Sequence, residues 1–141
     1  MFKIPVGGGL PVSLVKEYSI DPVWAPDGRF LLYSGPDVGT TFPLRAVSAD
    51  GTPFPLHTLI LTRGARHLAF LGEDMLIFLK GDISQKDFWS LDLKSGHERQ
   101  LTNLNRGSTI VDFDISRDGR EIVFDRVHEQ SEIVLFELPA H

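Results

Sequence analysis

The stretch of sequence that decides the fold reads Val23-Trp24-Ala25-Pro26-Asp27-Gly28-Arg29-Phe30-Leu31-Leu32-Tyr33. Two short apolar segments flank a Pro-Asp-Gly sequence, a pattern that is typical of a β-hairpin. Proline presets φ for the turn, aspartate can accept a hydrogen bond from the nearby backbone, and glycine tolerates the positive φ that follows. We therefore predict two antiparallel strands joined by a tight turn, with Gly28 at a positive φ.

The same hairpin pattern occurs twice more along the chain. A clear copy lies at Phe113–Phe124, where the turn reads Ser116-Arg117-Asp118-Gly119. A degenerate copy lies at Leu68–Phe78, where Gly72-Glu73-Asp74 replaces the turn motif and predicts a distorted hairpin. The anchors of the three copies, separated by about 45 residues, are Trp24, Phe70 and Ile115. Hairpins that recur at this period indicate a propeller-like array, and we expect Gly119 to share the positive φ of Gly28.

A second set of hairpins alternates with the first, and its turns contain Gly9, Gly51 and Gly96. Together the two sets predict units of four strands: a strand pair within residues 1–15, then blades at about 20–57, 64–104 and 109–138. The last unit supplies only three strands, of which the third covers residues 133–138. The predicted fold is therefore all-β, a single β-propeller domain over residues 1–141 with about three four-stranded blades.

These units resemble the repeats of TolB-like β-propellers, a WD-type repeat family. The resemblance is carried by Ala25-Pro26-Asp27-Gly28-Arg29, by Ser116-Arg117-Asp118-Gly119-Arg120, and by Gln100-Leu101-Thr102, which is similar to the end of such a blade. It implies a ring of about six blades and a bacterial source. It also implies a periplasmic or otherwise extracytoplasmic location, or the sensor part of a larger regulator. The function that it implies is a non-enzymatic binding or scaffold module that contacts a protein or peptide at one face of the ring.

Two other functions stay open. A propeller can screen substrates for a hydrolase, as in prolyl-oligopeptidase-type peptidases, although the chain shows no hydrolase domain. The chain can also be an excised or engineered half-propeller that self-assembles. Because propellers host binding modules, scaffolds and enzymes alike, the fold does not choose among these functions.

Three blades are half of the count that the resemblance implies. An open arc would leave an apolar sheet face bare at each end, and contiguous apolar surface of that size is rare on soluble monomers. We therefore expect a homo-oligomer, most simply a two-fold homodimer that closes one ring of six blades. In this arrangement the strand at Leu10–Val15 adds to the edge of the partner's last blade.

The composition excludes several classes of partner. The net charge of −5 argues against a nucleic-acid surface, which normally carries a basic patch. No apolar run is long enough for membrane insertion, and Pro5, Gly7–Gly9 and Pro11 interrupt any signal-peptide pattern near residue 1. The chain has no cysteine, so disulfide chemistry does not indicate its compartment.

No motif for catalysis or for a cofactor is present, so we expect a protein that is not an enzyme and needs no cofactor. The five histidines are scattered without the spacing of metal ligands. The segment Asp112–Gly119 superficially resembles a calcium loop. Apolar residues alternate with its carboxylates as in a half-buried strand, so a strand and turn are favoured over a calcium site.

One set of polar residues occupies equivalent positions in the three units. Three residues before each anchor stand Asp21, His67 and Asp112, at the entry to the innermost strand. In the family that the chain resembles, this point lies near the mouth of the central channel. The set is our candidate binding site, for a ligand, a cation or a partner's chain end, and the alternative is that these side chains only cap loops. Trp24 and Trp89 are expected to pack between sheets.

Overall fold

The computed structural model describes residues 1–62, 66–82, 85–104 and 109–127. All regular elements among these residues are β-strands. None of the described residues belongs to a helix that is long and apolar enough to cross a membrane. The expected all-β class is therefore confirmed.

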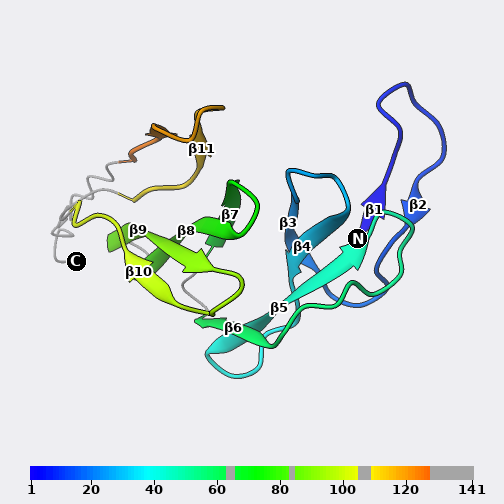
Figure 1. Ribbon diagram of the computed structural model, residues 1–141, viewed down its shortest axis with the longest axis horizontal. Helices are drawn as coiled ribbons and strands as arrows, with labels where there is room; N and C mark the ends of the chain where they lie inside the picture. Colours follow the sequence, from blue (N-terminus) through cyan, green and yellow to red (C-terminus); the bar gives the residue numbers. More distant parts are fainter. Residues whose placement is uncertain (63–65, 83–84, 105–108, 128–141) are drawn as a thin grey trace, which may run out of the picture.

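Two four-stranded antiparallel sheets form most of the described chain, and in each the strands follow one another in sequence order (Figure 1). The first sheet consists of β3 (Ile20–Trp24), β4 (Phe30–Ser34), β5 (Thr41–Ser48) and β6 (Leu59–Thr62). The second sheet consists of β7 (Arg66–Leu71), β8 (Met75–Asp82), β9 (Gln85–Asp92) and β10 (Glu98–Gln100). The expected four-stranded antiparallel units are thus present, whereas closure into a ring and the number of blades stay predictions.

Shorter strand pairs lie on either side of these two sheets. The head pair, β1 (Phe2–Lys3) and β2 (Val12–Ser13), precedes the first sheet, and the third sheet, β11 (Phe113–Ile115) and β12 (Ile122–Phe124), follows the second. Figure 1 shows the head pair at one side of the molecule and β11 at the other. The strand expected at 133–138 lies outside the described residues.

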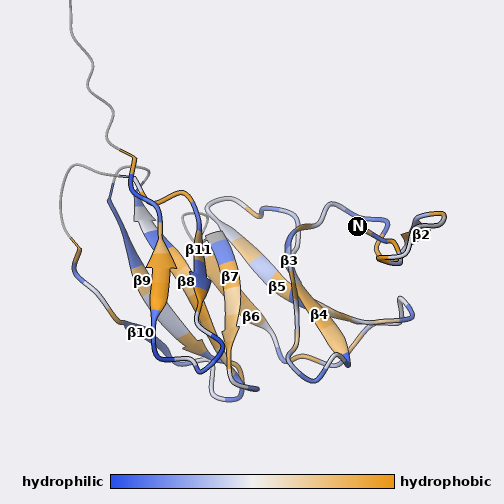
Figure 2. Ribbon diagram, turned by 90° about the horizontal axis from the view of Figure 1, so that it is seen from above, coloured by the Kyte–Doolittle hydropathy of each residue, from blue (hydrophilic) through white to orange (hydrophobic). Residues whose placement is uncertain are grey.

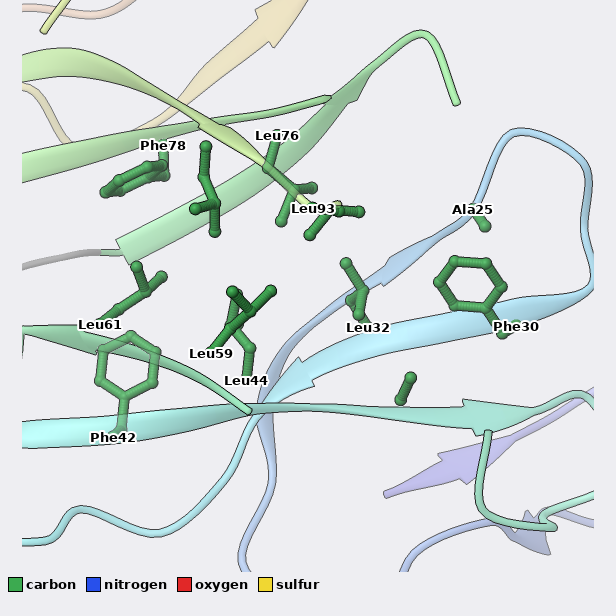
Figure 3. Packing of buried hydrophobic residues seen from close by; sticks show 12 residues of the cluster. Ala25, Phe30, Leu32, Phe42, Leu44, Leu59, Leu61, Leu76, Phe78 and Leu93 are labelled. Atoms are coloured by element: carbon green, nitrogen blue, oxygen red, sulfur yellow. The ribbon is translucent and has the colours of Figure 1, made fainter. Parts of the chain in front are cut away.

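The sheets pack face to face. Successive residues of the central strands point to opposite faces of their sheet, and apolar residues occupy both faces. Leu32, Leu44 and Leu61 of the first sheet meet Leu76 and Phe78 of the second in one buried cluster, and Figure 3 shows these side chains pointing toward one another. Each fully buried side chain of this size contributes about 1.5–3 kcal/mol to folding. Figure 2 shows the hydrophobic colouring along β4 of the first sheet.

The second sheet packs on the third in the same way. Ile77, Leu79 and Phe88 are buried against the apolar face of the β11–β12 pair. The ring of Phe88 stands edge-on to Phe113 at 5.1 Å and to Phe124 at 5.3 Å, a favoured aromatic geometry. The first strand of each sheet lies beside the first strand of the next, since β3 contacts β7 and β7 contacts β11.

The turn predictions are confirmed at both Asp-Gly hairpins. Gly28 has a φ of 71° and Gly119 a φ of 70°. Each turn is closed by a hydrogen bond from the glycine N–H, to Ala25 O in the first sheet and to Ser116 O in the third, both at 2.8 Å. The middle hairpin is shorter rather than distorted: Leu71 pairs directly with Met75, and Gly72 has a φ of 70°.

Two expected strand positions need correction. The first sheet ends at Thr62, beyond the boundary expected at about His57, because its fourth strand is Leu59–Thr62. Pro53 and Pro55 have no N–H, so the segment after the Gly51 turn makes only a bridge to Val47 before regular pairing with β5 begins at Leu59. In the head pair, the hairpin expected across residues 1–15 is reduced to two paired residues on each side.

The prediction for one tryptophan is also wrong. Trp89 packs against the main cluster as expected, but Trp24 is 47% exposed. The difference has a simple cause: Trp89 has a neighbouring sheet, whereas Trp24 faces the small head pair across a cleft.

Candidate functional site

The candidate residues lie where the first strand of each sheet begins. Asp21 is the second residue of β3, His67 is the second residue of β7, and Asp112 immediately precedes β11. The strand register agrees with the equivalence predicted from the sequence, since Trp24 pairs with Leu31 just as Phe70 pairs with Leu76.

Asp21 and His67 share an uncommon backbone conformation. Both have a φ of 52°, and they are the two non-glycine residues with positive φ in the described part of the chain. Each lies at a bulge, because the pairing shifts between Ile20 and Val23 in β3 and between Arg66 and Leu68 in β7. A left-handed conformation costs an L-residue roughly 1–2 kcal/mol, and such strain is concentrated at binding and catalytic sites.

The structure brings two of the three candidates together. His67 Nδ1 lies 3.6 Å from Asp112 Oδ1, within the range of an ion pair when the imidazole is protonated. Asp112 Oδ1 also accepts a hydrogen bond from the N–H of Phe113 at 2.8 Å, so this side chain caps the start of β11 as well. The binding and capping interpretations are therefore compatible at Asp112.

A third acidic residue, Asp125, stands opposite this strand entry, just after the end of β12. Its Oδ1 accepts the N–H of Val111 at 2.8 Å and the N–H of Asp112 at 3.1 Å. These backbone hydrogen bonds, first that from Asp112 and then that from Val111, lower the pKa of Asp125, and the nearby His67 lowers it further. The carboxyl group of Asp125 is thus ionised at neutral pH.

Three buried side-chain oxygens have no hydrogen-bond partner among the described residues: Ser19 Oγ, Asp21 Oδ2 and Ser34 Oγ. Ser34, which is almost fully buried, stands opposite Ile20 in the β3–β4 ladder. Buried polar atoms are normally paired, and unpaired ones in a native fold call for a role. We name these residues at corresponding strand ends of the three sheets the inner-strand site: Asp21, His67, Asp112, Asp125 and Ser34. Contacts join His67, Asp112 and Asp125, whereas Asp21 and Ser34 belong to the equivalent strand ends of the first sheet.

Sequence reasoning missed Ser34 and Asp125. The strand register makes the two residues equivalent. Tyr33, Phe78 and Phe124 occupy corresponding positions in the three sheets, and Ser34 and Asp125 each follow that position by one residue. A polar residue at the end of the second strand of a hairpin could have indicated these two positions. The residue that each one faces on the first strand depends on the bulge, which the sequence pattern does not show.

The site offers carboxylate oxygens, an imidazole and a hydroxyl, which suit a ligand that carries positive charge or several N–H donors. Among the described residues, no group of three or more His, Asp or Glu side chains is arranged to hold a metal ion. The segment considered as a calcium loop forms β11 and the following turn, as favoured from the sequence: Asp114 pairs with Val123, and Asp118 accepts the hydroxyl of Ser116 at 2.7 Å.

Comparison with known proteins adds no identification: no protein-family model, no curated protein and no solved structure matches the chain.

Proposed function

We propose that the chain is a non-enzymatic binding module of the β-propeller type, and that its inner-strand site binds a positively charged group of a protein or peptide partner. The observation that carries the proposal is the shared left-handed conformation of Asp21 and His67, at equivalent positions of two neighbouring sheets. A strained backbone conformation that occurs at the same position of two sheets is explained by a role for the side chains that it positions.

The charge of the site favours a cationic group. Asp21 and Asp112 bring carboxylates to the starts of β3 and β11, and Asp125 adds a third from the end of β12, against the single imidazole of His67. The buried Asp21 Oδ2 has no hydrogen-bond partner among the described residues, so its acceptor capacity is unused within the chain. An amino terminus, a lysine or an arginine supplies such donors, and charge-assisted hydrogen bonds to carboxylates are about twice as strong as neutral ones.

The experiment measures binding to an array of peptides that carry either a free or an acetylated amino terminus, with and without lysine and arginine. We expect binding that requires at least one positive group on the peptide. The combined variant Asp21→Asn, His67→Ala, Asp112→Asn should lose this binding while its free energy of unfolding changes little. Glu73→Gln, in the exposed β7–β8 turn, is the control for a lost charge. Equal binding by the triple variant and the control would return the three residues to a capping role.

A further inference from the structure

The head of the molecule carries an apolar cleft that belongs neither to the core nor to the inner-strand site. This head cleft lies between the head pair, with Phe2 and Val12, and the outer face of the first sheet, with Trp24 and Leu31. Its volume is about 520 Å³. Phe2 is 69% exposed, and Ile4, Leu10 and Val12 nearby are exposed as well. Exposed apolar side chains gathered around one cleft mark an interaction surface.

The internal repeat shows what kind of surface covers such a face. Trp24 and Leu31 form a cross-strand pair equivalent to Phe70 and Leu76 in the second sheet, and to Ile115 and Ile122 in the third. The two later pairs are packed against the preceding sheet. In the first sheet Leu31 of the equivalent pair is buried beside Leu14 and Val15, whereas Trp24 is left 47% exposed at the head cleft.

The complementary surface is equally well defined. The face that receives the next sheet carries Leu32 in the first sheet and Ile77 in the second, and both are buried by that next sheet. The equivalent residue of the third sheet is Val123, paired with Asp114, and it is 70% exposed. We name this outer side of the β11–β12 pair the tail face.

We propose that the head cleft of one copy of this chain binds the tail face of a second copy, so that the contact between sheets inside the chain is repeated between chains. The surfaces match in kind, since Trp24 and Val123 occupy the two halves of an interface that the fold already builds twice. They also match in charge. Lys3 lines the head cleft, whereas Asp112, Asp114 and Asp125 surround Val123 on the tail face.

The head pair is held in place for this role. The amino group of Met1 donates to Val15 O at 2.7 Å, and Met1 O accepts the N–H of Leu14 at 2.9 Å. Lys3 Nζ donates to Ala49 O of the turn after β5. These contacts fix the outer wall of the cleft before a partner arrives, which lowers the conformational entropy lost on association.

The test uses one variant at each surface and measures mass by light scattering and sedimentation at micromolar concentration. Trp24→Glu places a charge in the head cleft, and Val123→Glu places one on the tail face. Val38→Glu, in the exposed β4–β5 loop, is the matched control. The parent and the control should self-associate, and each surface variant should bind its own kind about tenfold more weakly or worse, as expected for a central apolar contact.

Mixing the two surface variants decides the orientation. The Trp24→Glu chain keeps an unaltered tail face, and the Val123→Glu chain keeps an unaltered head cleft. An equimolar mixture should therefore recover association through one intact contact. A head-to-head dimer gives a different result: Val123→Glu associates like the parent, and mixing rescues nothing. That result overturns the proposal, as does a parent protein that stays monomeric.

Folding defects are separated from assembly defects by a second head variant, Phe2→Glu, and by urea unfolding of every variant. Phe2 is largely exposed, so its replacement leaves the unfolding midpoint unchanged while weakening association. Association of Phe2→Glu equal to that of the parent, in a chain that folds normally, removes the head cleft from the interface.

Discussion

Asp21 in β3 and His67 in β7 have the same left-handed backbone conformation, with a φ of 52° at both residues. The two strands are neighbours in space and equivalent in the repeat, so the same strain recurs at one point of the first and second sheets but not at Asp112 of the third. In the third sheet, Asp112 stands at the corresponding place and pairs with His67. The bulge that each strained residue creates turns the start of its strand away from regular pairing.

The first prediction concerns that strain. At His67, glycine should give a free energy of unfolding about 1 kcal/mol above that of alanine, because glycine has no Cβ and adopts the left-handed region without steric cost. At Ala69, a regular position of the same strand, the order should be reversed, with Ala69→Gly destabilising by about 0.5–1 kcal/mol. Urea unfolding of His67→Gly, His67→Ala and Ala69→Gly measures both differences. Alanine more stable than glycine at residue 67 would contradict the strain.

A second prediction compares the two Asp-Gly turns. Gly119→Val should lower the free energy of unfolding by about 1–3 kcal/mol, since a β-branched residue is poorly tolerated at positive φ. Gly28→Val should cost less. A Cβ at residue 28 meets no atom within 4 Å, whereas at residue 119 it would stand 2.7 Å from Leu71 Cδ1. In a Leu71→Ala background the two costs should converge, and thermal unfolding that shows no loss for Gly119→Val would refute the turn assignment.

Stability should also fall in acid. The carboxyl groups with lowered pKa values that accept backbone N–H groups in turns or at strand ends are Asp27, Asp50, Asp92, Asp118 and Asp125. Because their pKa values are lower in the folded state than in the unfolded chain, their stabilisation is fully present above the unfolded value of about 3.9. It is lost as the pH falls from there through the folded values. The urea midpoint should therefore drop below about pH 4.

The control for this acid effect replaces single carboxyl groups. Asparagine keeps an oxygen that can accept the turn hydrogen bond but does not titrate. Asp27→Asn and Asp118→Asn should therefore fold at neutral pH and show a shallower fall of the midpoint in acid. If the curves of these variants are parallel to that of the parent, the two turns do not contribute to acid unfolding.

The last prediction concerns the end of the second sheet. Thr102 Oγ1 donates to Asp87 Oδ1 and accepts the N–H of Phe88, both at 3.0 Å, and Leu104 N–H donates to the same carboxylate oxygen at 2.7 Å. Thr102→Val removes the hydroxyl and should cost about 1–3 kcal/mol, the usual effect of leaving buried partners unpaired. Thr102→Ser keeps the hydroxyl and should cost less. Equal losses in chemical unfolding would assign the role of Thr102 to its methyl group.

The sequence by itself determined the local hairpins. Pro26-Asp27-Gly28 and Arg117-Asp118-Gly119 specify their turns through φ preferences and hydrogen bonds that span only a few residues, so no distant contact is needed to predict them. The repeat also placed Asp21, His67 and Asp112 at equivalent positions, because every repeating unit enters its first strand in the same way.

Only the tertiary structure decided which of these residues meet and which faces stay bare. The approach of His67 to Asp112, and the hydrogen bonds of Asp125 to the same strand entry, depend on how the second and third sheets lie side by side. Trp24 and Phe70 are alike in pattern, yet Phe70 packs on a full sheet and Trp24 faces a cleft. Burial is a property of the neighbour as much as of the residue, and in this chain the neighbour comes from another part of the sequence.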